Sequence, residues 1–507
     1  KVTLTNCSVE NVTIEAKGSV GGLIGHAGAN PATYHTITGC TVKDSTLKCT
    51  ETGKSWRVGD LVGTANVGQV TVDAATSASQ NILTQENADP QKPKDNIFGR
   101  KEVGTAGLVI IDNKVVAAGT DYGDIVNKNA NEVLVEVSKG HWVKPHEDTV
   151  AMIGAKEYPT LTAAINEANT GETVKLLKDV TENVTIPAGK TITLDLNGMT
   201  LTNVDDHTIL NNGNLTIMGT GRVDNISHAK GALYNKGTVV INGGTFDRSR
   251  ENGMNKGESG QNSWYTIKNV GTMTINDGAT VQTAGNNAAL GKFSSLVSNG
   301  YFNANDYNTN KGLDQPILTI DGGTFRGGLN TIKNDDRARL TINGGTFSNY
   351  YQAVVQNHNI AEITGGTFTA ASDANTETYG IYNCGCGAGI DLGTLTVSGG
   401  TFTGATYAVA EVSSQNAIVN ISGGQFAGTK AAIIKSSTSN ATIAISGGKF
   451  SSDPSVYVVG NGNTNIVKRD GSEGAYTYTV LAKSGLTSGV YLTDPSGALA
   501  NNYYVSS

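Results

Sequence analysis

The chain has 507 residues, of which 64 are glycine, 9 are proline and 16% are charged, and its net charge is −7. No long run of lysine and arginine is present, which argues against a nucleic-acid partner. No stretch approaches the ~18 consecutive apolar residues of a membrane span, so we expect no transmembrane segment. The low charged fraction indicates that Thr, Ser and Asn carry solubility, which favours an extracellular, β-rich protein.

Residues 1–85 contain a first internal repeat. The phrase around Cys7 returns around Cys40, and Gly21-Gly22-Leu23-Ile24-Gly25 returns as Gly59-Asp60-Leu61-Val62-Gly63. Repeats that combine strand-like alternation with tight glycine turns predict stacked β-structure. Residues 86–150 are less regular, and we expect an irregular β-rich connector there.

The two glycine phrases resemble the GLUG motif of large secreted bacterial proteins, including some immunoglobulin-cleaving peptidases. In those proteins the motif belongs to a non-catalytic β-helical accessory segment, which is what the resemblance implies here. The chain contains no His-Glu-x-x-His sequence, so no peptidase activity is carried over.

The five cysteines are an odd number. Cys7 and Cys40 hold equivalent places in the repeat, and we expect them to be small buried hydrophobic residues stacked on each other rather than a disulfide. Cys384-Gly385-Cys386 is too tight for an ordinary structural disulfide. Neither a second cysteine pair nor a histidine accompanies it in the sequence, so we interpret it as part of a loop, with a metal site as the less favoured alternative.

A second domain is expected to begin near residue 151 and to run to residue 481. Leu161, Ala164, Ile165 and Ala168 follow helical spacing, and Thr160 is a suitable N-cap. The sequence therefore predicts a short helix over about 160–169. It would cover the open end of the core that follows.

The second domain repeats one phrase: an aliphatic–polar–aliphatic triplet, two glycines, a polar residue and a phenylalanine. Copies end at Phe246, Phe325, Phe347, Phe368, Phe402, Phe426 and Phe450, and a degenerate copy ends at Val281. A period just above twenty residues with strand–turn–strand content indicates a solenoid. A third apolar segment ends nine residues after four of these phenylalanines, at Asn334, Gln356, Glu411 and Lys435, which predicts three strands per turn.

This pattern resembles the right-handed parallel β-helix of pectate-lyase-like enzymes and of many bacterial surface proteins. The resemblance implies an all-β fold in which like residues stack on like residues about 4.8 Å apart. Asn235, Asn269, Asn299, Asn334 and Asn383 recur at the corner after the third strand. They are either a hydrogen-bonded ladder or residues that tolerate a left-handed turn.

At the end of the coil, residues 456–459 are expected to close the stack and 475–481 to pair as a capping strand. Residues 482–507 are expected to be a tail or the start of another module. Because the sequence begins in mid-strand, we expect it to be a piece of a longer protein.

The resemblance raises the alternative of an enzyme, either a polysaccharide lyase or a glycoside hydrolase. Asp335, Asp336 and Arg337 are the candidate catalytic residues, because hydrolysis needs paired carboxylates at one cleft. The rest of the polygalacturonase set is missing, and a charged turn explains the cluster more simply. A lyase would require Ca²⁺, which is the alternative to our expectation of no cofactor.

The favoured hypothesis is a non-catalytic adhesin, carbohydrate-binding or spacer module, secreted or on a bacterial cell surface. Its expected partner is a glycan or another host or cell-surface ligand, and we expect a monomer. Aromatic residues at the edges of loops could stack on sugar rings, or else fill wide corners of the coil. The candidate binding residues are Trp264, Tyr265, Tyr301, Tyr307, Tyr351, Tyr379 and Tyr407, and Phe302 lies in the same loop as Tyr301.

Overall fold

The computed structural model contains two compact units, Lys1–Glu147 and Asp148–Ser507. It describes residues 1–27, 34–51, 57–65, 69–73, 75–85, 98–101, 109–111, 114–116, 135–138, 141–143, 145–252, 264–287, 289–371, 377–461, 464–469, 474–482, 484, 490–493 and 499–505. No helix in this described part of the chain has the length and apolar character needed to cross a membrane.

The first unit is built from parallel strands that recur along the chain. Its sheets comprise β1 (Val2–Thr5), β6 (Tyr34–Thr38), β11 (Gln69–Val72), β15 (Val109–Ile111) and β16 (Lys114–Val116); β5 (Ile24–Ala27), β10 (Val62–Ala65) and β14 (Phe98–Lys101); β2 (Ser8–Glu10), β7 (Thr41–Lys43) and β12 (Ser77–Ser79); β3 (Thr13–Ala16), β8 (Thr46–Cys49) and β13 (Ile82–Gln85); β4 (Val20–Gly21) and β9 (Val58–Gly59); and β17 (Val135–Ser138) with β18 (His141–Val143). Strands β14 and β15 extend the sheets of the repeat beyond residue 85.

The equivalence of Cys7 and Cys40 is visible in the first unit. Both side chains belong to one apolar cluster, and the backbone N–H of Cys7 points to Sγ of Cys40 at 3.4 Å. All five cysteines are free. Cys7 and Cys40 are therefore stacked as predicted, although Cys7 is partly exposed rather than buried.

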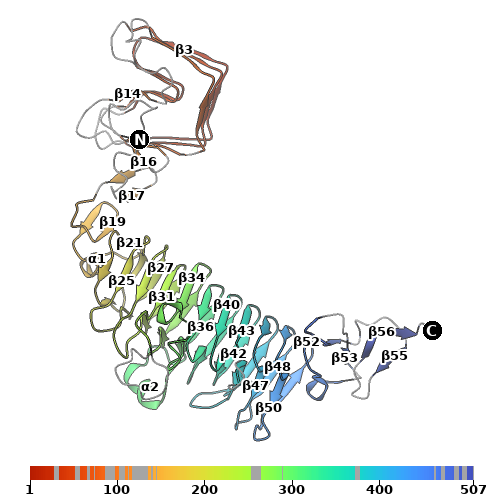
Figure 1. Cartoon of the computed structure of the whole chain (residues 1–507). Coiled ribbons are helices and arrows are strands. Elements are labelled where there is room, and N and C mark those ends of the chain that lie inside the picture. Colours follow the sequence, from red (N-terminus) through yellow and green to blue (C-terminus); the bar gives the residue numbers. More distant parts are fainter. Residues whose placement is uncertain are drawn as a thin grey trace. The chain divides into compact units, whose positions relative to one another are not determined.

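The second unit is a parallel β-helix with three strands per turn, as the repeat predicted. Figure 1 shows its strands following one another from β21 to β52. The first sheet contains β19 (Ala151–Ile153), β20 (Lys156–Tyr158), β21 (Thr173–Leu176), β24 (Thr191–Asp195), β27 (Asn214–Met218), β30 (Thr238–Ile241), β33 (Thr272–Ile275), β36 (Ile317–Ile320), β39 (Arg339–Ile342), β42 (Ile360–Ile363), β45 (Thr394–Val397), β48 (Ile418–Ile421) and β51 (Thr442–Ile445).

The other two sheets complete each turn. The second contains β22 (Val180–Thr181), β25 (Thr200–Thr202), β28 (Arg222–Asp224), β31 (Gly244–Asp247), β34 (Ala279–Gln282), β37 (Thr324–Arg326), β40 (Thr346–Asn349), β43 (Thr367–Ala370), β46 (Thr401–Thr403), β49 (Gln425–Phe426), β52 (Gly448–Phe450), β53 (Asn465–Arg469), β54 (Tyr478–Ala482), β55 (Val490–Thr493) and β56 (Leu499–Val505). The third contains β23 (Val184–Ile186), β26 (Ile209–Asn211), β29 (Leu233–Asn235), β32 (Ile267–Asn269), β35 (Val297–Asn299), β38 (Asn330–Asn334), β41 (Ala353–Asn357), β44 (Tyr379–Asn383), β47 (Tyr407–Glu411) and β50 (Ala431–Lys435).

Both ends of this coil are closed. At the N-terminal end, helix α1 (Leu161–Glu167) buries Leu161, Ala164 and Ile165, and its N-cap Thr160 accepts a hydrogen bond from Ala163 N. At the other end, β54 pairs antiparallel with β52, which confirms the predicted capping strand. At residues 456–459, which were expected to close the stack, the 3₁₀-helix η3 (Ser455–Tyr457) is followed by one bridge between Val458 and Ile445 of β51. Strand β56 pairs in parallel with β53, with Leu499 opposite Lys468.

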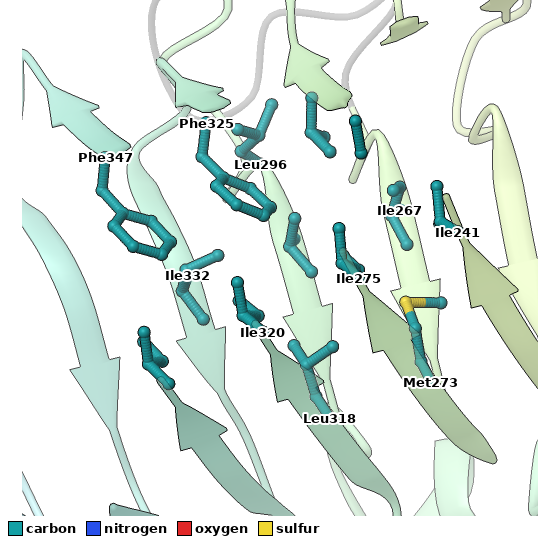
Figure 2. Close-up of a cluster of buried hydrophobic side chains, with 14 of the residues drawn as sticks. Ile241, Ile267, Met273, Ile275, Leu296, Leu318, Ile320, Phe325, Ile332 and Phe347 are labelled. Atoms are coloured by element: carbon teal, nitrogen blue, oxygen red, sulfur yellow. The ribbon is translucent and has the colours of Figure 1, made fainter. Parts of the chain in front are cut away.

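The phenylalanines of the repeat form one internal column. From Phe325 to Phe450 every ring is fully buried, and neighbouring ring centroids lie 4.3 to 5.2 Å apart with nearly parallel planes. Figure 2 shows Phe325 and Phe347 side by side, with Ile320 and Ile332 directed into the same interior. Burial of these apolar surfaces is the main contribution to the stability of the coil.

The two glycines of each phrase are needed for different structural reasons. A Cβ at the first glycine, Gly365, would lie 2.3 Å from the carbonyl oxygen of Asn343 on the preceding coil. The second, Gly366, has φ of +103°, a conformation that side chains with a Cβ disfavour. The first glycine is therefore required by the close approach of the preceding coil, and the second by its left-handed backbone conformation.

The corner asparagines form a continuous ladder. Each donates a hydrogen bond from Nδ2 to Oδ1 of the next, in the order Asn211, Asn235, Asn269, Asn299, Asn334, Asn357 and Asn383. Asn383 then donates to the carboxylate of Glu411. None of these asparagines has a positive φ, so the ladder is the correct one of the two interpretations.

The constant offset of nine residues fails on one turn. In the sheet Asn334 pairs with Asn357, and Gln356 pairs with Lys333. The turn that follows Phe347 is one residue longer than expected, so Asn357 takes the ladder position and Gln356 belongs to the outward column. The predicted landmark at Gln356 was therefore wrong by one residue.

Candidate functional site

The loop at 300–315 leaves the coil after the ladder residue Asn299 and carries helix α2 (Ala304–Asn310) outside the coil (Figure 1). Asn303 caps this helix by accepting hydrogen bonds from the N–H groups of Asn305 and Asp306. Tyr301 anchors the loop, because its hydroxyl donates to Leu313 O at 2.9 Å and accepts from Gly312 N at 3.0 Å.

Tyr301 and Tyr307, two of the candidate binding residues, pack against each other where this loop is anchored. Tyr301 is fully buried, and burial raises its pKa to about 12. Its ring meets that of Tyr307 edge-on at 5.0 Å. Tyr301 is therefore corrected from a ligand-binding to a structural residue, because no ligand can reach its ring.

Outward-facing side chains of the third sheet form a column on consecutive coils. The register places Lys268, Ser298, Lys333, Gln356 and Tyr382 at equivalent positions. Lys268 pairs with Asp306 of α2, with 2.8 Å between Nζ and Oδ2. The α2 loop packs against this column of side chains, which we call the floor.

A pocket of about 630 Å³ opens above this floor. Aromatic rings, amides, hydroxyls and two lysines line it: Tyr265, Lys292, Phe293, Ser294, Ser295, Phe302, Leu329, Asn330, Lys333, Gln352 and Gln356. The volume suits a small ligand or part of a longer one. We call this cavity the aromatic pocket.

The polar groups of the aromatic pocket are ordered by contacts with one another. Asn330 is buried, and its Nδ2 donates to Gln356 Oε1 at 2.8 Å. Phe302 has 60% of its surface exposed. Lys333 Nζ lies 5.3 Å from the centre of the Phe302 ring, and Lys292 Nζ lies 4.5 Å from that of Tyr351. The pocket therefore joins an accessible aromatic ring to fixed hydrogen-bonding amides.

The candidate catalytic carboxylates lie beneath this pocket and are buried. Asp335 is 1% exposed and Asp336 is 7% exposed. Asp335 lies 2.9 Å from Lys333 Nζ and 3.3 Å from His358 Nδ1, and Asp336 lies 3.8 Å from the same nitrogen. Burial opposes ionisation of Asp335, but His358 and Lys333 outweigh it and lower its pKa.

The imidazole of His358 is the centre of this cluster. Burial lowers its pKa, but the interactions with Asp335, Asp336 and Cys386 prevail and raise it to about 11. The exposed thiol of Cys386 lies 2.7 Å from Cys384 Sγ. The contact with Cys384 and the interaction with His358 lower the pKa of Cys386. The contact with Cys386 and burial raise the pKa of Cys384. The structure thus supplies the histidine that does not accompany the cysteines in the sequence.

Arg337 points away from this cluster. It is exposed, and its guanidinium carbon lies 3.8 Å from the centre of the Tyr307 ring. Together with Asp314, Gln315, Asn359, Gly389 and Ile390 it lines a second cavity of about 480 Å³. The structure therefore does not direct the three candidate catalytic residues into one cleft.

The other candidate binding residues fall into separate groups. Trp264 packs against His207 and Tyr234, with ring centroids 4.7 and 5.8 Å away. Tyr265 lines the aromatic pocket, and Tyr351 lies under Lys292 at its edge. Tyr379 stacks on Tyr407 at 6.2 Å, on later coils. The predicted strip is thus divided: Trp264 contacts Tyr265 of the pocket, with ring centroids 5.3 Å apart, whereas Tyr379 and Tyr407 are not part of the pocket lining.

Sequence reasoning missed Phe293 as a pocket residue and His358 as a member of the polar cluster. Phe293 has no repeat partner, so nothing in the pattern singled it out. His358 directly follows Asn357, the ladder residue that was misplaced by one position. Correct alignment of the ladder would have put Asp335, His358 and Cys384 in one column.

Comparison of the chain with known protein families, curated proteins and solved structures found no match. The site's geometry is therefore the basis on which a function can be argued.

Proposed function

We propose that this chain is a non-catalytic β-helix protein, secreted or displayed on a bacterial cell surface, that binds a glycan in the aromatic pocket. The observation that supports this proposal most strongly is that exposed Phe302 shares one cavity with the amides of Asn330 and Gln356, which are hydrogen-bonded to each other. Sugar rings have an apolar face that stacks on aromatic side chains and hydroxyls that bond to amides.

The lysines of the pocket favour a glycan that carries some negative charge. Lys333 is held by Asp335, but Lys292 lies at the pocket with its ammonium over Tyr351. A uronic acid or sulfated sugar would gain from this cation, whereas a neutral sugar would rely on stacking and on hydrogen bonds to the amides. Binding of the charged glycan should then weaken as salt concentration rises.

The enzyme alternative has less support from the geometry. General acid–base hydrolysis needs two carboxylates directed at one bound sugar. Asp335 and Asp336 are buried against His358 instead, and Asp335 is also paired with Lys333. A lyase would need oxygen ligands for Ca²⁺ beside an accessible base, but these buried carboxylates face the nitrogens of His358 and Lys333.

The test is a glycan array of neutral, uronate and sulfated polysaccharides, followed by titration calorimetry with any glycan that binds. Phe302→Ala should weaken binding about fivefold or more, because one stacked ring contributes about 1 kcal/mol. Phe302 is largely exposed, so its removal should leave the fold intact.

Tyr379→Ala is the matched control, because it removes a half-buried aromatic residue that lies outside the pocket lining. Equal loss in both variants, or a blank array, would refute the pocket and leave a spacer as the better account. Release of reducing ends or of unsaturated products from the same polysaccharides, abolished by Asp335→Asn, would instead establish the enzyme.

A further inference from the structure

Three consecutive coils place metal-ligating residues at one position of the fold. Asn334, Asn357 and Asn383 are paired in register as rungs of the ladder. The residue after each of them is Asp335, His358 and Cys384. Strand pairing therefore brings a carboxylate, an imidazole and a thiol together from residues 49 positions apart.

Two further groups join this column from the same corner: Asp336 and Cys386. One ligand atom from each of His358, Cys384 and Cys386 lies within 4.8 Å of the others, and the same holds for Asp335, Asp336 and His358. Tetrahedral zinc sites have bonds of about 2.0–2.3 Å, which puts neighbouring ligand atoms about 3.3–3.8 Å apart. The imidazole and the two thiols are close enough to converge on one ion, and the sulfurs, 2.7 Å apart, would separate by about 1 Å to share it.

His358 provides an independent indication of a missing partner. The residue is 8% exposed, and in the described part of the chain neither ring nitrogen has a hydrogen bond of acceptable geometry. Nδ1 is still paired electrostatically with Asp335 and Asp336, but among the described residues Nε2 makes no ion pair, and a coordinated ion would satisfy that buried nitrogen. Asp335, 3.3 Å from Nδ1, is placed to orient the ring from behind.

The loop that carries the cysteines is held tightly against the carboxylates. Gly387 has φ of +85°, and a Cβ on it would lie 1.8 Å from Oδ1 of Asp336. Arg337 N donates to Ala388 O at 2.8 Å, and Gly393 N donates to His358 O at 2.9 Å. These backbone contacts fix the loop on both sides of Cys386, so the ligand set is built into the fold rather than assembled by chance.

We propose that Cys384, Cys386 and His358 form a three-residue zinc-binding site in which Asp335 and Asp336, both on the Nδ1 side of the ring, orient His358. Two thiolates and an imidazole are the donors that Zn²⁺ prefers, whereas Ca²⁺ takes oxygen ligands. Binding replaces the thiol protons of the two cysteines by bonds to the ion, so protons are released as zinc binds. The ion would tie two consecutive coils together, with Asp335 of the preceding coil behind His358.

The experiment is metal titration of the full chain, reduced with a phosphine and freed of metal by a chelator. Added Co²⁺ should give the visible bands of a tetrahedral ion and thiolate charge-transfer absorption, saturating at one ion per chain. Zn²⁺ should abolish both signals by displacement. Cys386→Ser should remove the charge-transfer signal or weaken affinity by at least about tenfold, and His358→Gln should do the same.

Cys7→Ser is the matched control, because Cys7 is a partly exposed free cysteine outside the cluster. This variant should bind Co²⁺ as the parent chain does. Circular dichroism checks that each variant keeps its β-structure, and Cys386 is exposed, so its substitution should be tolerated. The proposal is overturned if the reduced chain binds no Co²⁺, or if Cys386→Ser binds it unchanged. It is equally overturned if mass spectrometry finds a Cys384–Cys386 disulfide and reduction does not create metal binding.

Discussion

Asn334 donates a hydrogen bond from Nδ2 to Oδ1 of Asn357 on the next coil, at 2.8 Å. The same contact is repeated from coil to coil, so each amide both donates to and accepts from an identical neighbour. Buried amides without partners cost free energy, and the ladder satisfies them while fixing the vertical register of the coils. Asp335, His358 and Cys384 owe their proximity to this register.

The first prediction concerns the ladder. Asn269 donates to Asn299 Oδ1 at 2.7 Å and to Ile317 O at 2.9 Å, and it is fully buried. Asn269→Ala should lower the free energy of unfolding by about 2–4 kcal/mol, because it leaves buried groups on both neighbouring coils unsatisfied. Urea unfolding measures the change.

Asn343→Ala is the control for this prediction. Asn343 also donates to a neighbouring coil, at 2.7 Å to Asp321 Oδ1, but it is exposed to water. Its loss should cost less than about 1 kcal/mol. Equal effects at the buried and exposed positions would show that the ladder contributes no special stability.

The second prediction concerns the aromatic column. The Phe368 ring lies between those of Phe347 and Phe402, with centroids 4.7 and 4.3 Å away. Phe368→Ala should cost about 3–5 kcal/mol, because it removes a buried ring and leaves a cavity. Phe302→Ala, at an exposed ring, should leave the unfolding midpoint nearly unchanged. A small effect at Phe368 would mean that the rings do not form one core.

The third prediction concerns pH. Burial lowers the pKa of His207 to about 4, and its Nδ1 accepts a hydrogen bond from Gly231 N at 2.9 Å. The unfolded chain, with a pKa near about 6.5, binds the proton more readily than the folded chain. This stabilising contribution is therefore complete above about pH 6.5 and is lost as the pH falls towards about 4, to the extent of at most about 3 kcal/mol.

His207→Asn isolates this effect, since an amide oxygen can accept the same hydrogen bond but does not titrate in this range. Urea unfolding of both proteins at about pH 7 and about pH 4.5 gives the comparison. The parent chain should lose more stability than the variant on acidification. Parallel losses in the two proteins would exclude His207 as the cause.

The fourth prediction concerns the paired glycines. Gly365→Ala should cost roughly 2–3 kcal/mol, because its Cβ would meet the carbonyl oxygen of Asn343 at 2.3 Å. Gly154 is the comparison, because its φ is +53° and a Cβ added there would have no atom within 4 Å. Gly154→Ala should cost about 1 kcal/mol, from backbone strain alone. Thermal unfolding of both variants gives the comparison. Equal losses of stability would show that the contact of the Gly365 position with Asn343 adds nothing to the backbone strain.

The fold could be predicted because its determinants repeat. The recurrence of phenylalanine, of paired glycines and of asparagine predicted the three sheets and the inner column, and the helical spacing after Thr160 predicted the capping helix. The register failed where the repeat was interrupted: one additional residue after Phe347 moved the ladder position from Gln356 to Asn357. A pattern of period two cannot reveal such an insertion when apolar residues stand on both sides of it.

The candidate site could be predicted only in part, because it is not periodic. The carboxylates of Asp335 and Asp336 were recognised, but their burial against His358 depends on loop contacts from the following coil. Tyr301 was expected to be accessible because aromatic residues are common at loop edges. Its burial follows from the fold of the α2 loop, which no repeat specifies.

The most direct test of glycan recognition is a crystal structure of this chain with a glycan that it binds. The account predicts a sugar ring against Phe302, with hydroxyls within hydrogen-bonding distance of Asn330 or Gln356. A sugar seated on Tyr379 and Tyr407 instead, with the aromatic pocket containing only water, would contradict it.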